Sequence, residues 1–250
     1  VPGEVDIQKQ ILKFGHKIIS LDVEGLVPSN GEEGVRLRYG EKAISLTEIL
    51  FFWGKKHYQS VLNVYPSIKN KAIISGSPII DDVYLKKAKK NINTKSKILI
   101  ATSCGYANHI GGKDYSKRMT RNAQGKNLKE SEITKIKNEV LLDEKIFDFW
   151  NIFIPKLAKN LSNTTIIVRP HPSEDKTFWE KSLAKYKNIE INKSGSINEQ
   201  LKDASSFIHF NSTASITSRI LDVPTFMILP KLEEKLIERI INSTTQKGDL

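Results

Sequence analysis

The stretch TIIVRPHPSE at Thr165–Glu174 constrains the fold of this chain more than any other. Its β-branched run at 166–169 is typical of a parallel strand that is covered on both faces. Pro170 and Pro172 then fix two φ angles and restrict the residue before each of them, which ends the strand. His171 is therefore expected at the carboxyl end of a buried strand, where open α/β sheets bind their ligands.

Segments typical of strands and of helices alternate along the chain. Strands are expected at 17–21, 71–78, 97–103, 166–169, 189–191, 206–210 and 224–229, and helices at 8–14, 143–161, 178–186, 196–204, 216–221 and 232–241. Thr47 is interpreted as the N-cap of a further helix, with Glu48 in its first turn. The alternation predicts an α/β fold with mainly parallel sheets.

The polar, lysine-rich stretch at 91–97 is interpreted as a linker between two domains. The predicted division is an N-terminal domain at 1–92, a C-terminal domain at 93–230 and a C-terminal helix or tail at 231–250. No repeat with the period of a solenoid is present, so each domain is expected to have its own core.

The net charge of +11 has two interpretations. Lysines spread over solvated faces would explain it, and so would attraction to nucleic acid, an anionic membrane or phosphorylated substrates. The chain has no nucleic-acid-binding motif and its aromatic residues do not interleave with its basic runs, so no nucleic-acid partner is expected. The basic region at 113–139 is interpreted as solvated surface or as a contact with an anionic acceptor or membrane.

The one cysteine, Cys104, excludes an internal disulfide and fits a reducing compartment. No apolar run approaches the roughly 18 residues that a membrane-spanning helix needs. A cytoplasmic location is therefore expected, with the possibility of peripheral binding at the inner face of the cytoplasmic membrane.

Asn211, Ser212 and Thr213 lie between a strand and a helix in this prediction. All three residue types are common N-caps, which would explain them without any ligand. The first amides of a helix have no intrahelical partner, so the same residues could bind an anion. Since His171 ends another strand of the same predicted sheet, the two segments could together bind a phosphate.

His171 could equally be a structural histidine. Arg169 before it adds a donor that stays charged, and Glu174 could orient the imidazole or accept a hydrogen bond from a sugar hydroxyl. The five histidines are scattered without the spacing of metal ligands, so no metal site is expected.

Asp22 and Glu24 follow a predicted strand in the other half of the chain. Residues two apart on an extended segment share a face, so the two carboxylates could act together. A turn that contains two acids is the simpler interpretation, whereas a base for a hydroxyl group is the functional one.

Six segments resemble, in chain order, the bacterial surface carbohydrate biosynthesis proteins, which are similar to GT-B glycosyltransferases that use CMP-sugars, including bacterial sialyltransferases and β-Kdo transferases. The segments are Asp22–Leu26, Phe52–Gly54, Ser75–Pro78 with Asp81, Ile98–His109, Val168–Glu174 and Asn211–Thr213. The resemblance runs from about Gly15 to Pro230. The chain departs from the pattern Asp-Glu-Glu-Gly at Val23, and its N-terminal domain is short for a GT-B half.

The resemblance implies two Rossmann-like domains that face each other across a cleft, and a nucleotide-sugar donor, CMP-linked, with no further cofactor. His171, Ser212 and Thr213 would contact the donor phosphate, and Asp22 or Glu24 would be the base. The other residues implied in nucleotide binding are Arg169, Pro172, Glu174, Asn211, Ser103, Gly105, Asn108 and His109. The acceptor would be a glycan or a lipid-linked glycan of a surface polysaccharide.

Two alternatives stay open from the sequence. The same scaffold could transfer glycerophosphate from a CDP donor or epimerise a sugar nucleotide. The chain could also be a non-catalytic module that binds a glycan or a nucleotide, an interpretation that Val23 favours.

Overall fold

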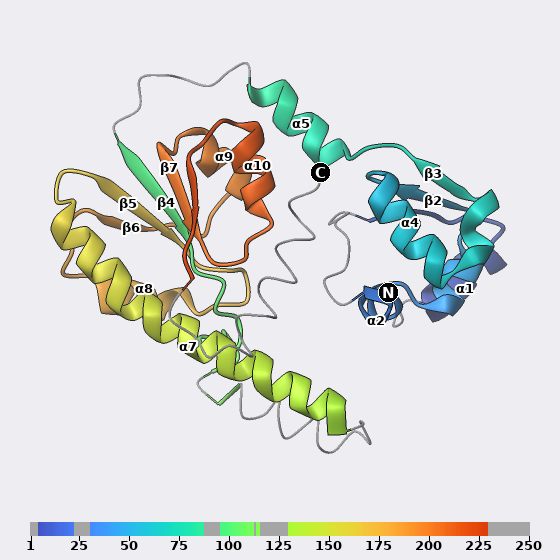
Figure 1. Cartoon of the computed structure of the whole chain (residues 1–250), viewed down its shortest axis with the longest axis horizontal. Helices are drawn as coiled ribbons and strands as arrows, with labels where there is room; N and C mark the ends of the chain where they lie inside the picture. Colours follow the sequence, from blue (N-terminus) through green and yellow to red (C-terminus); the bar gives the residue numbers. More distant parts are fainter. Residues whose placement is uncertain (1–4, 23–30, 88–95, 113, 116–129, 230–250) are drawn as a thin grey trace. The chain divides into compact units, whose positions relative to one another are not determined.

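The computed structural model describes residues 5–22, 31–87, 96–112, 114–115 and 130–229, which form two compact units (Figure 1). Unit 1 contains the described residues up to Asp82, and unit 2 begins at Val83. The predicted domain boundary between residues 92 and 93 lies outside the described residues, as does the predicted helix at 232–241. Both stay predictions.

Unit 1 is built on a small parallel sheet. Its elements are α1 (Val5–Lys13), β1 (Ile19–Leu21), α2 (Gly31–Arg38), α3 (Glu41–Leu46), β2 (Ile49–Phe52), α4 (Lys55–Val64), the 3-10 helix η2 (Pro66–Asn70) and β3 (Ala72–Ile74). The strand order is β1-β2-β3, and both pairs are parallel. Leu50 and Phe52 of β2 are buried in a cluster with side chains from α2, α3, α4 and η2. This cluster is the core of unit 1.

The helix predicted to begin at Thr47 is wrong, because the strand β2 occupies this part of the chain. Thr47 instead follows the end of α3, where its hydroxyl donates to the carbonyl oxygen of Ala43 at 2.9 Å. The hydroxyl that suits an N-cap thus binds the preceding helix. The apolar residues that follow pair with β1 on one side and with β3 on the other.

Unit 2 contains a larger parallel sheet. The boundary between the units, between Asp82 and Val83, falls within the helix α5 (Pro78–Lys87). The elements of unit 2 after α5 are β4 (Lys97–Ala101), α7 (Glu130–Asn160), β5 (Thr165–Arg169), α8 (Lys176–Leu183), β6 (Ile189–Ile191), α9 (Ile197–Lys202), β7 (Ser206–His209), α10 (Ala214–Ile220) and β8 (Thr225–Met227). The strand order is β6-β5-β4-β7-β8, and every pair is parallel. The predicted α/β class with parallel sheets is therefore confirmed in both units.

The stretch with which the sequence analysis begins forms β5, an interior strand of this sheet between β6 and β4. Alternate residues of a strand point to opposite faces. Ile167 belongs to a buried cluster with side chains from α9 and α10. Ile166 and Val168 point to the other face and are both fully buried. The prediction of a strand covered on both faces is confirmed.

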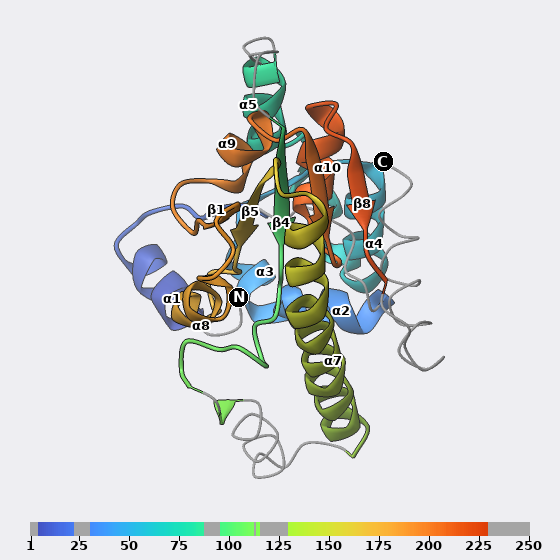
Figure 2. The same ribbon diagram turned by 90° about the vertical axis from the view of Figure 1, so that its left-hand side faces the viewer.

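The helix α7 is longer than the predicted helix at 143–161. It begins at Glu130, and its amino-terminal part extends past the carboxyl ends of the strands (Figure 2). Trp150 is fully buried, and its Nε1 donates to the carbonyl oxygen of Thr102 at 2.9 Å, which attaches α7 to the segment after β4. Neither α7 nor any other helix in the described ranges is apolar enough over sufficient length to span a bilayer.

Candidate functional site

The carboxyl ends of three neighbouring strands meet at one edge of the sheet of unit 2. Ala101 of β4 pairs with Arg169 of β5 on one side and with His209 of β7 on the other. The segments that follow these strands, 102–109, 170–175 and 210–213, hold every predicted nucleotide-binding residue except Arg169, which is the last residue of β5. Ligands of open α/β sheets bind at this edge.

His171 has an exposed ring whose tautomer follows from its neighbours. The backbone N–H of Ser173 donates to Nδ1 at 3.2 Å, and the hydroxyl oxygen of Ser173 lies 2.7 Å from the same atom. Because a backbone N–H can only donate, Nδ1 is an acceptor, and the neutral imidazole carries its proton on Nε2. His171 can therefore donate a hydrogen bond from Nε2 to an anionic oxygen.

Gly105 lies against the turn that carries this histidine. A Cβ atom at this position would come within 2.7 Å of the hydroxyl oxygen of Ser173 and 4.0 Å of Nδ1 of His171. Only glycine lets the segment after β4 approach the segment after β5 this closely without displacing Ser173. The glycine is thus explained by the packing of the two segments.

Glu174 is fully buried, and its carboxylate binds protein groups. Its Oε1 accepts from the Thr102 hydroxyl at 2.7 Å, from the Cys104 N–H at 2.9 Å and from the His171 N–H at 2.8 Å. Its Oε2 accepts from Nε1 of Trp179 at 2.9 Å. The sequence predicts that Glu174 contacts a ligand, whereas the structure gives it the role of joining the segments after β4 and β5.

Arg169 binds the protein as well. Its guanidinium donates to the carbonyl oxygens of Ser194 and Gly195, at 3.0 and 2.8 Å. These residues lie between β6 and α9. Arg169 therefore stabilises a neighbouring loop with two of its five N–H donors, and its contact with a nucleotide stays a prediction.

Asn108 and His109 lie in the segment after β4. Asn108 is buried, its Nδ2 donates to the carbonyl oxygen of Asp175 at 3.0 Å, and its own carbonyl accepts from the Asp175 N–H at 2.7 Å. The His109 ring stacks on Tyr115 with 3.4 Å between the centroids. Asn108 thus connects two segments of the sheet edge, and His109 contributes an aromatic surface beside them.

Asp143 of α7 supports the same segment, and the sequence analysis missed it. One carboxylate oxygen, Oδ2, accepts from the backbone N–H groups of Tyr106 and Ala107, at 2.9 and 2.7 Å. Burial raises the pKa of Asp143 to about 6, although these two hydrogen bonds act in the opposite direction. The signal available in the sequence was an acidic residue at a partly buried position of an amphipathic helix.

The segment after β7 carries three of the predicted nucleotide-binding residues, Asn211, Ser212 and Thr213. Ser212 donates its backbone N–H to Nδ1 of the buried His209 at 3.1 Å, and its hydroxyl oxygen accepts from the Ala214 N–H at 3.3 Å. Thr213 is exposed and its side chain makes no cap hydrogen bond to α10. Asn211 is exposed too, with a left-handed φ of 47°. Because α10 has seven residues, the hydroxyl groups rather than a long helix dipole would supply the attraction for an anion.

Ser103, which the sequence places among the nucleotide-binding residues, also has a left-handed backbone, with φ 55°. It stands two residues after Ala101, as Asn211 stands two residues after His209, the residue that pairs with Ala101. Two non-glycine residues thus take up an uncommon conformation at adjacent strand ends. Such conformations cost roughly 1–3 kcal/mol and are found more often at functional sites.

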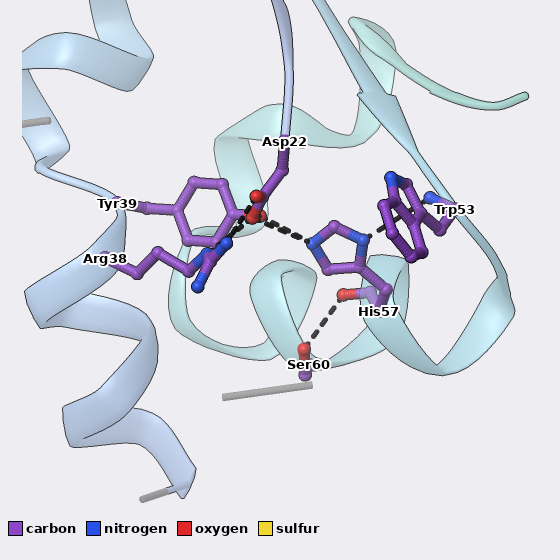
Figure 3. A network of polar contacts seen from close by, with 6 residues as sticks. All are labelled: Asp22, Arg38, Tyr39, Trp53, His57 and Ser60. Atoms are coloured by element: carbon purple, nitrogen blue, oxygen red, sulfur yellow. Dashed lines mark hydrogen bonds and ion pairs between the residues drawn. The ribbon is translucent and has the colours of Figure 1, made fainter. Parts of the chain in front are cut away.

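In unit 1, Asp22 lies directly after β1 and belongs to a polar network (Figure 3). Its two carboxylate oxygens accept from Nη2 and Nε of Arg38, both at 2.5 Å. The hydroxyl of Tyr39 donates to Oδ2 at 2.6 Å, and Nε2 of His57 lies 3.8 Å from the same oxygen. Glu24, the second predicted base, lies outside the described residues, so its predicted role stays untested.

His57 stands at the inner end of this network and is 3% exposed. The N–H of Trp53 donates to its Nδ1 at 3.4 Å, and its Nε2 lies 2.5 Å from the Tyr39 hydroxyl. Burial lowers the pKa of His57 to about 4, so the ring is neutral at pH 7. Burial and the hydrogen bond to Asp22 raise the pKa of Tyr39.

The sequence analysis missed Arg38, Tyr39 and His57 as partners of Asp22. They come from the end of α2, the residue after it and α4. His57 lies a few residues after the aromatic residues of β2. Nothing in the local sequence indicates that it contacts Asp22, which lies 35 residues earlier. Only the paired strands and their connecting helices bring these side chains together.

Cys104 packs in the interior of unit 2. It is fully buried, its thiol donates to the carbonyl oxygen of Thr102 at 3.4 Å, and burial raises its pKa. Within the described ranges, no group of three or more His, Cys, Asp or Glu side chains is arranged to hold a metal ion.

No protein-family model matches the sequence, and no curated protein matches it either. Among solved structures, the chain is similar to UDP-GlcNAc 2-epimerase from Methanocaldococcus jannaschii in complex with UDP-GlcNAc and UDP, with 17% identity and a TM-score of 0.49. The likeness covers 94% of this chain and 66% of the epimerase chain, so the chain spans just under two thirds of that protein. A second structure of the same epimerase gives 15% identity and a TM-score of 0.41, over 96% of this chain and 72% of that one.

Proposed function

We propose that this chain is a GT-B-type glycosyltransferase that binds the phosphate of a nucleotide sugar at the carboxyl edge of the sheet in unit 2. The observation that carries the proposal is the exposed His171, whose Nδ1 accepts from the Ser173 N–H, so that the neutral ring has its N–H donor at Nε2. The exposed hydroxyl of Thr213 follows a strand of the same edge. A fixed N–H donor and hydroxyl groups suit a phosphate whose charge increases during the reaction.

The proposed reaction is a single displacement with inversion. A hydroxyl oxygen of the acceptor forms a bond to the anomeric carbon of the donor sugar while the bond from that carbon to the phosphate oxygen breaks. The electron pair leaves with the nucleotide, and the hydrogen bond from His171 stabilises the departing phosphate, with Ser212 and Thr213 as further donors. Asp22 or Glu24 accepts the proton of the acceptor hydroxyl. The scheme needs no metal ion, because protein donors stabilise the leaving group.

The donor in this proposal is a CMP-activated acidic sugar, such as Kdo or a sialic-acid-like sugar. The acceptor is a glycan or lipid-linked glycan of a bacterial lipopolysaccharide or capsule. These assignments rest on the resemblance of the motif order to surface carbohydrate biosynthesis proteins. Location in the cytoplasm, with peripheral contact to the inner face of the membrane, would give the enzyme access to such an acceptor.

Calorimetric titration with CMP tests this proposal. The unaltered chain should bind CMP, and His171→Ala should weaken binding about ten- to a hundredfold, since a hydrogen bond to a charged group contributes roughly 1.5–3 kcal/mol. The control is His16→Ala, because His16 is an exposed histidine before β1 and should leave the affinity unchanged. Absence of CMP binding, or equal affinity of His171→Ala, would contradict the proposal.

The same titration separates the alternatives that the sequence leaves open. Tight binding of CDP with weak binding of CMP would indicate glycerophosphate transfer. Preference for UDP would indicate epimerisation of a sugar nucleotide. Binding of CMP without turnover of any CMP-sugar donor would indicate a non-catalytic binding module.

A further inference from the structure

The hydrogen bonds around Asp22 have a fixed direction of donation, which the proposed function does not use. His57 is buried, and its Nδ1 accepts from the backbone N–H of Trp53 at 3.4 Å. The neutral ring therefore carries its proton on Nε2, the atom that faces the Tyr39 hydroxyl at 2.5 Å. His57 must be the donor in this contact.

This assignment determines the next hydrogen bond. Tyr39 has one hydroxyl proton, and its oxygen already accepts from His57. The proton is thus directed to Oδ2 of Asp22, which lies 2.6 Å away. Each group therefore donates to the next. The Trp53 N–H donates to Nδ1 of His57, Nε2–H of His57 donates to the Tyr39 hydroxyl, and that hydroxyl donates to the Asp22 carboxylate.

Arg38 approaches the same carboxylate with a bidentate ion pair to both oxygens. The contact of a guanidinium with a carboxylate favours the ionised acid and makes it a weaker proton acceptor. The side chain of Asp22 is only 11% exposed, so water screens this pair little. The Asp22 carboxylate is therefore fixed by Arg38 and Tyr39 and is poorly suited to accept a proton from a sugar hydroxyl.

We infer that Asp22 is a positioning residue rather than the catalytic base, and that Arg38, Tyr39 and His57 hold its carboxylate in one orientation at the carboxyl edge of the sheet in unit 1. This inference rests on the proposed function and leaves Glu24, the other predicted base, as the expected proton acceptor. Asp22 fixes the backbone at the point where the chain leaves β1, two residues before Glu24. Displacement of a catalytic group by about 1 Å can lower a rate a hundredfold, so a rigid anchor here matters for the rate.

The pH dependence of kcat for sugar transfer from a CMP donor tests the inference. Asp22→Asn and Tyr39→Phe should lower kcat about ten- to a hundredfold while the acid limb of the profile stays at the same pH. Glu24→Gln should lower kcat about a hundred- to ten-thousandfold and remove that limb, because the titrating base is gone. Loss of the acid limb in Asp22→Asn, or an unchanged kcat in Tyr39→Phe, would overturn the inference.

A matched pair of variants at His57 separates positioning from general loss of structure. His57→Gln keeps an N–H donor for Tyr39, whereas His57→Leu removes it. We expect His57→Gln to retain several-fold more activity than His57→Leu. Equal activities in the two variants would show that the donor has no role. If His57→Leu fails to fold, as circular dichroism would reveal, Tyr39→Phe gives the decisive comparison, since it removes one hydroxyl group only.

Failure of the proposed function gives a different result. In that case the unaltered chain transfers no sugar from a CMP donor, and NMR of the His57 imidazole decides the inferred order of donors. The Nε2–H tautomer with a strongly downfield proton that shifts upfield in Tyr39→Phe supports the order. The Nδ1–H tautomer, or an unshifted proton in Tyr39→Phe, would refute it.

Discussion

Two acids with little exposure to water, the partly buried Asp22 and the fully buried Glu174, lie near the carboxyl edges of the two sheets, and the chain stabilises them differently. Asp22 of unit 1 is paired with the guanidinium of Arg38 and with the Tyr39 hydroxyl. Glu174 of unit 2 accepts its four hydrogen bonds from uncharged donors, two of them backbone N–H groups. A buried carboxylate needs either an opposite charge or a full set of donors, and this chain uses one solution in each unit.

The difference indicates what each acid does. The backbone donors of Glu174 belong to the segments after β4 and β5, so this acid connects the main chain on which His171 is carried. The hydrogen bonds that Asp22 accepts from Arg38 and Tyr39 come from side chains, so these partners determine the orientation of a carboxylate. Loss of Glu174 should therefore damage the fold of unit 2, whereas loss of a partner of Asp22 should act mainly on a side chain.

Replacement of Glu174 by Ala should have the largest effect. The N–H groups of Cys104, His171 and Trp179 would lose their acceptor together, and we expect the free energy of unfolding to fall by about 3–5 kcal/mol. Urea unfolding followed by tryptophan fluorescence measures this, because Trp150 and Trp179 lie in unit 2.

The control for this variant is Glu180→Ala, which removes a partly exposed acid on α8 that forms a surface ion pair with Lys176. Such pairs contribute roughly 0–1 kcal/mol, so its unfolding free energy should change little. Equal stabilities of the Glu174→Ala and Glu180→Ala variants would show that Glu174 does not connect the two segments.

His57 gives a smaller, pH-dependent effect in unit 1. Its pKa is lowered to about 4 in the folded chain, mainly by burial, and is about 6.5 in the unfolded chain. Between these values the unfolded chain binds the additional proton, so the stability contributed is complete above pH 6.5 and is lost as the pH falls toward 4. The loss is at most about 3 kcal/mol.

Native-state hydrogen exchange of the amides in α4 between pH 7 and 4 measures this dependence. His57→Gln lacks the titration and should show a shallower loss of protection than the unaltered chain. His16→Gln, at an exposed position, should behave like the unaltered chain. If His57→Gln loses protection as steeply as His16→Gln, the histidine does not titrate in this way.

Gly105→Ala should have the smallest effect of the three. The new methyl group would meet the hydroxyl oxygen of Ser173 at 2.7 Å and displace a side chain that holds Nδ1 of His171. We expect a loss of about 1–2 kcal/mol in the free energy of unfolding. Addition of Ser173→Ala should recover part of it, because the clashing oxygen is removed, and a double-mutant cycle quantifies the recovery. Strict additivity of the two changes would mean that the methyl group and Ser173 do not meet.

The sequence predicted the strand ends of unit 2 because local patterns contain the information. The β-branched run of β5 followed by two prolines indicates a buried strand and its end without reference to the rest of the chain. The same patterns place His171 and Asn211–Thr213 after strands, and parallel pairing then brings them to one edge. The register of the pairs was not available from the sequence, since it depends on strands far apart in the chain.

Local signals failed where a side chain had more than one possible partner. Thr47 has the hydroxyl of an N-cap, but it binds the end of the preceding helix, and a strand follows it. Arg169 and Glu174 are polar residues beside the predicted ligand-binding edge, but Arg169 donates to a loop of the protein and the Glu174 carboxylate accepts from protein groups. Residue type and position predict that a group can bind; they do not reveal which neighbour it meets first.

The sequence by itself determined the α/β class and the placement of His171, Ser212 and Thr213 after strands, because backbone stiffness and hydrophobic pattern act over short distances. Only the tertiary structure decided the burial of Glu174 and the network that holds Asp22. These depend on contacts between residues that are distant in the chain, such as Asp22 and His57 or Glu174 and Thr102. Hydrogen bonds have directions and limited numbers of donors and acceptors, so the roles of these groups follow from the partners that folding provides.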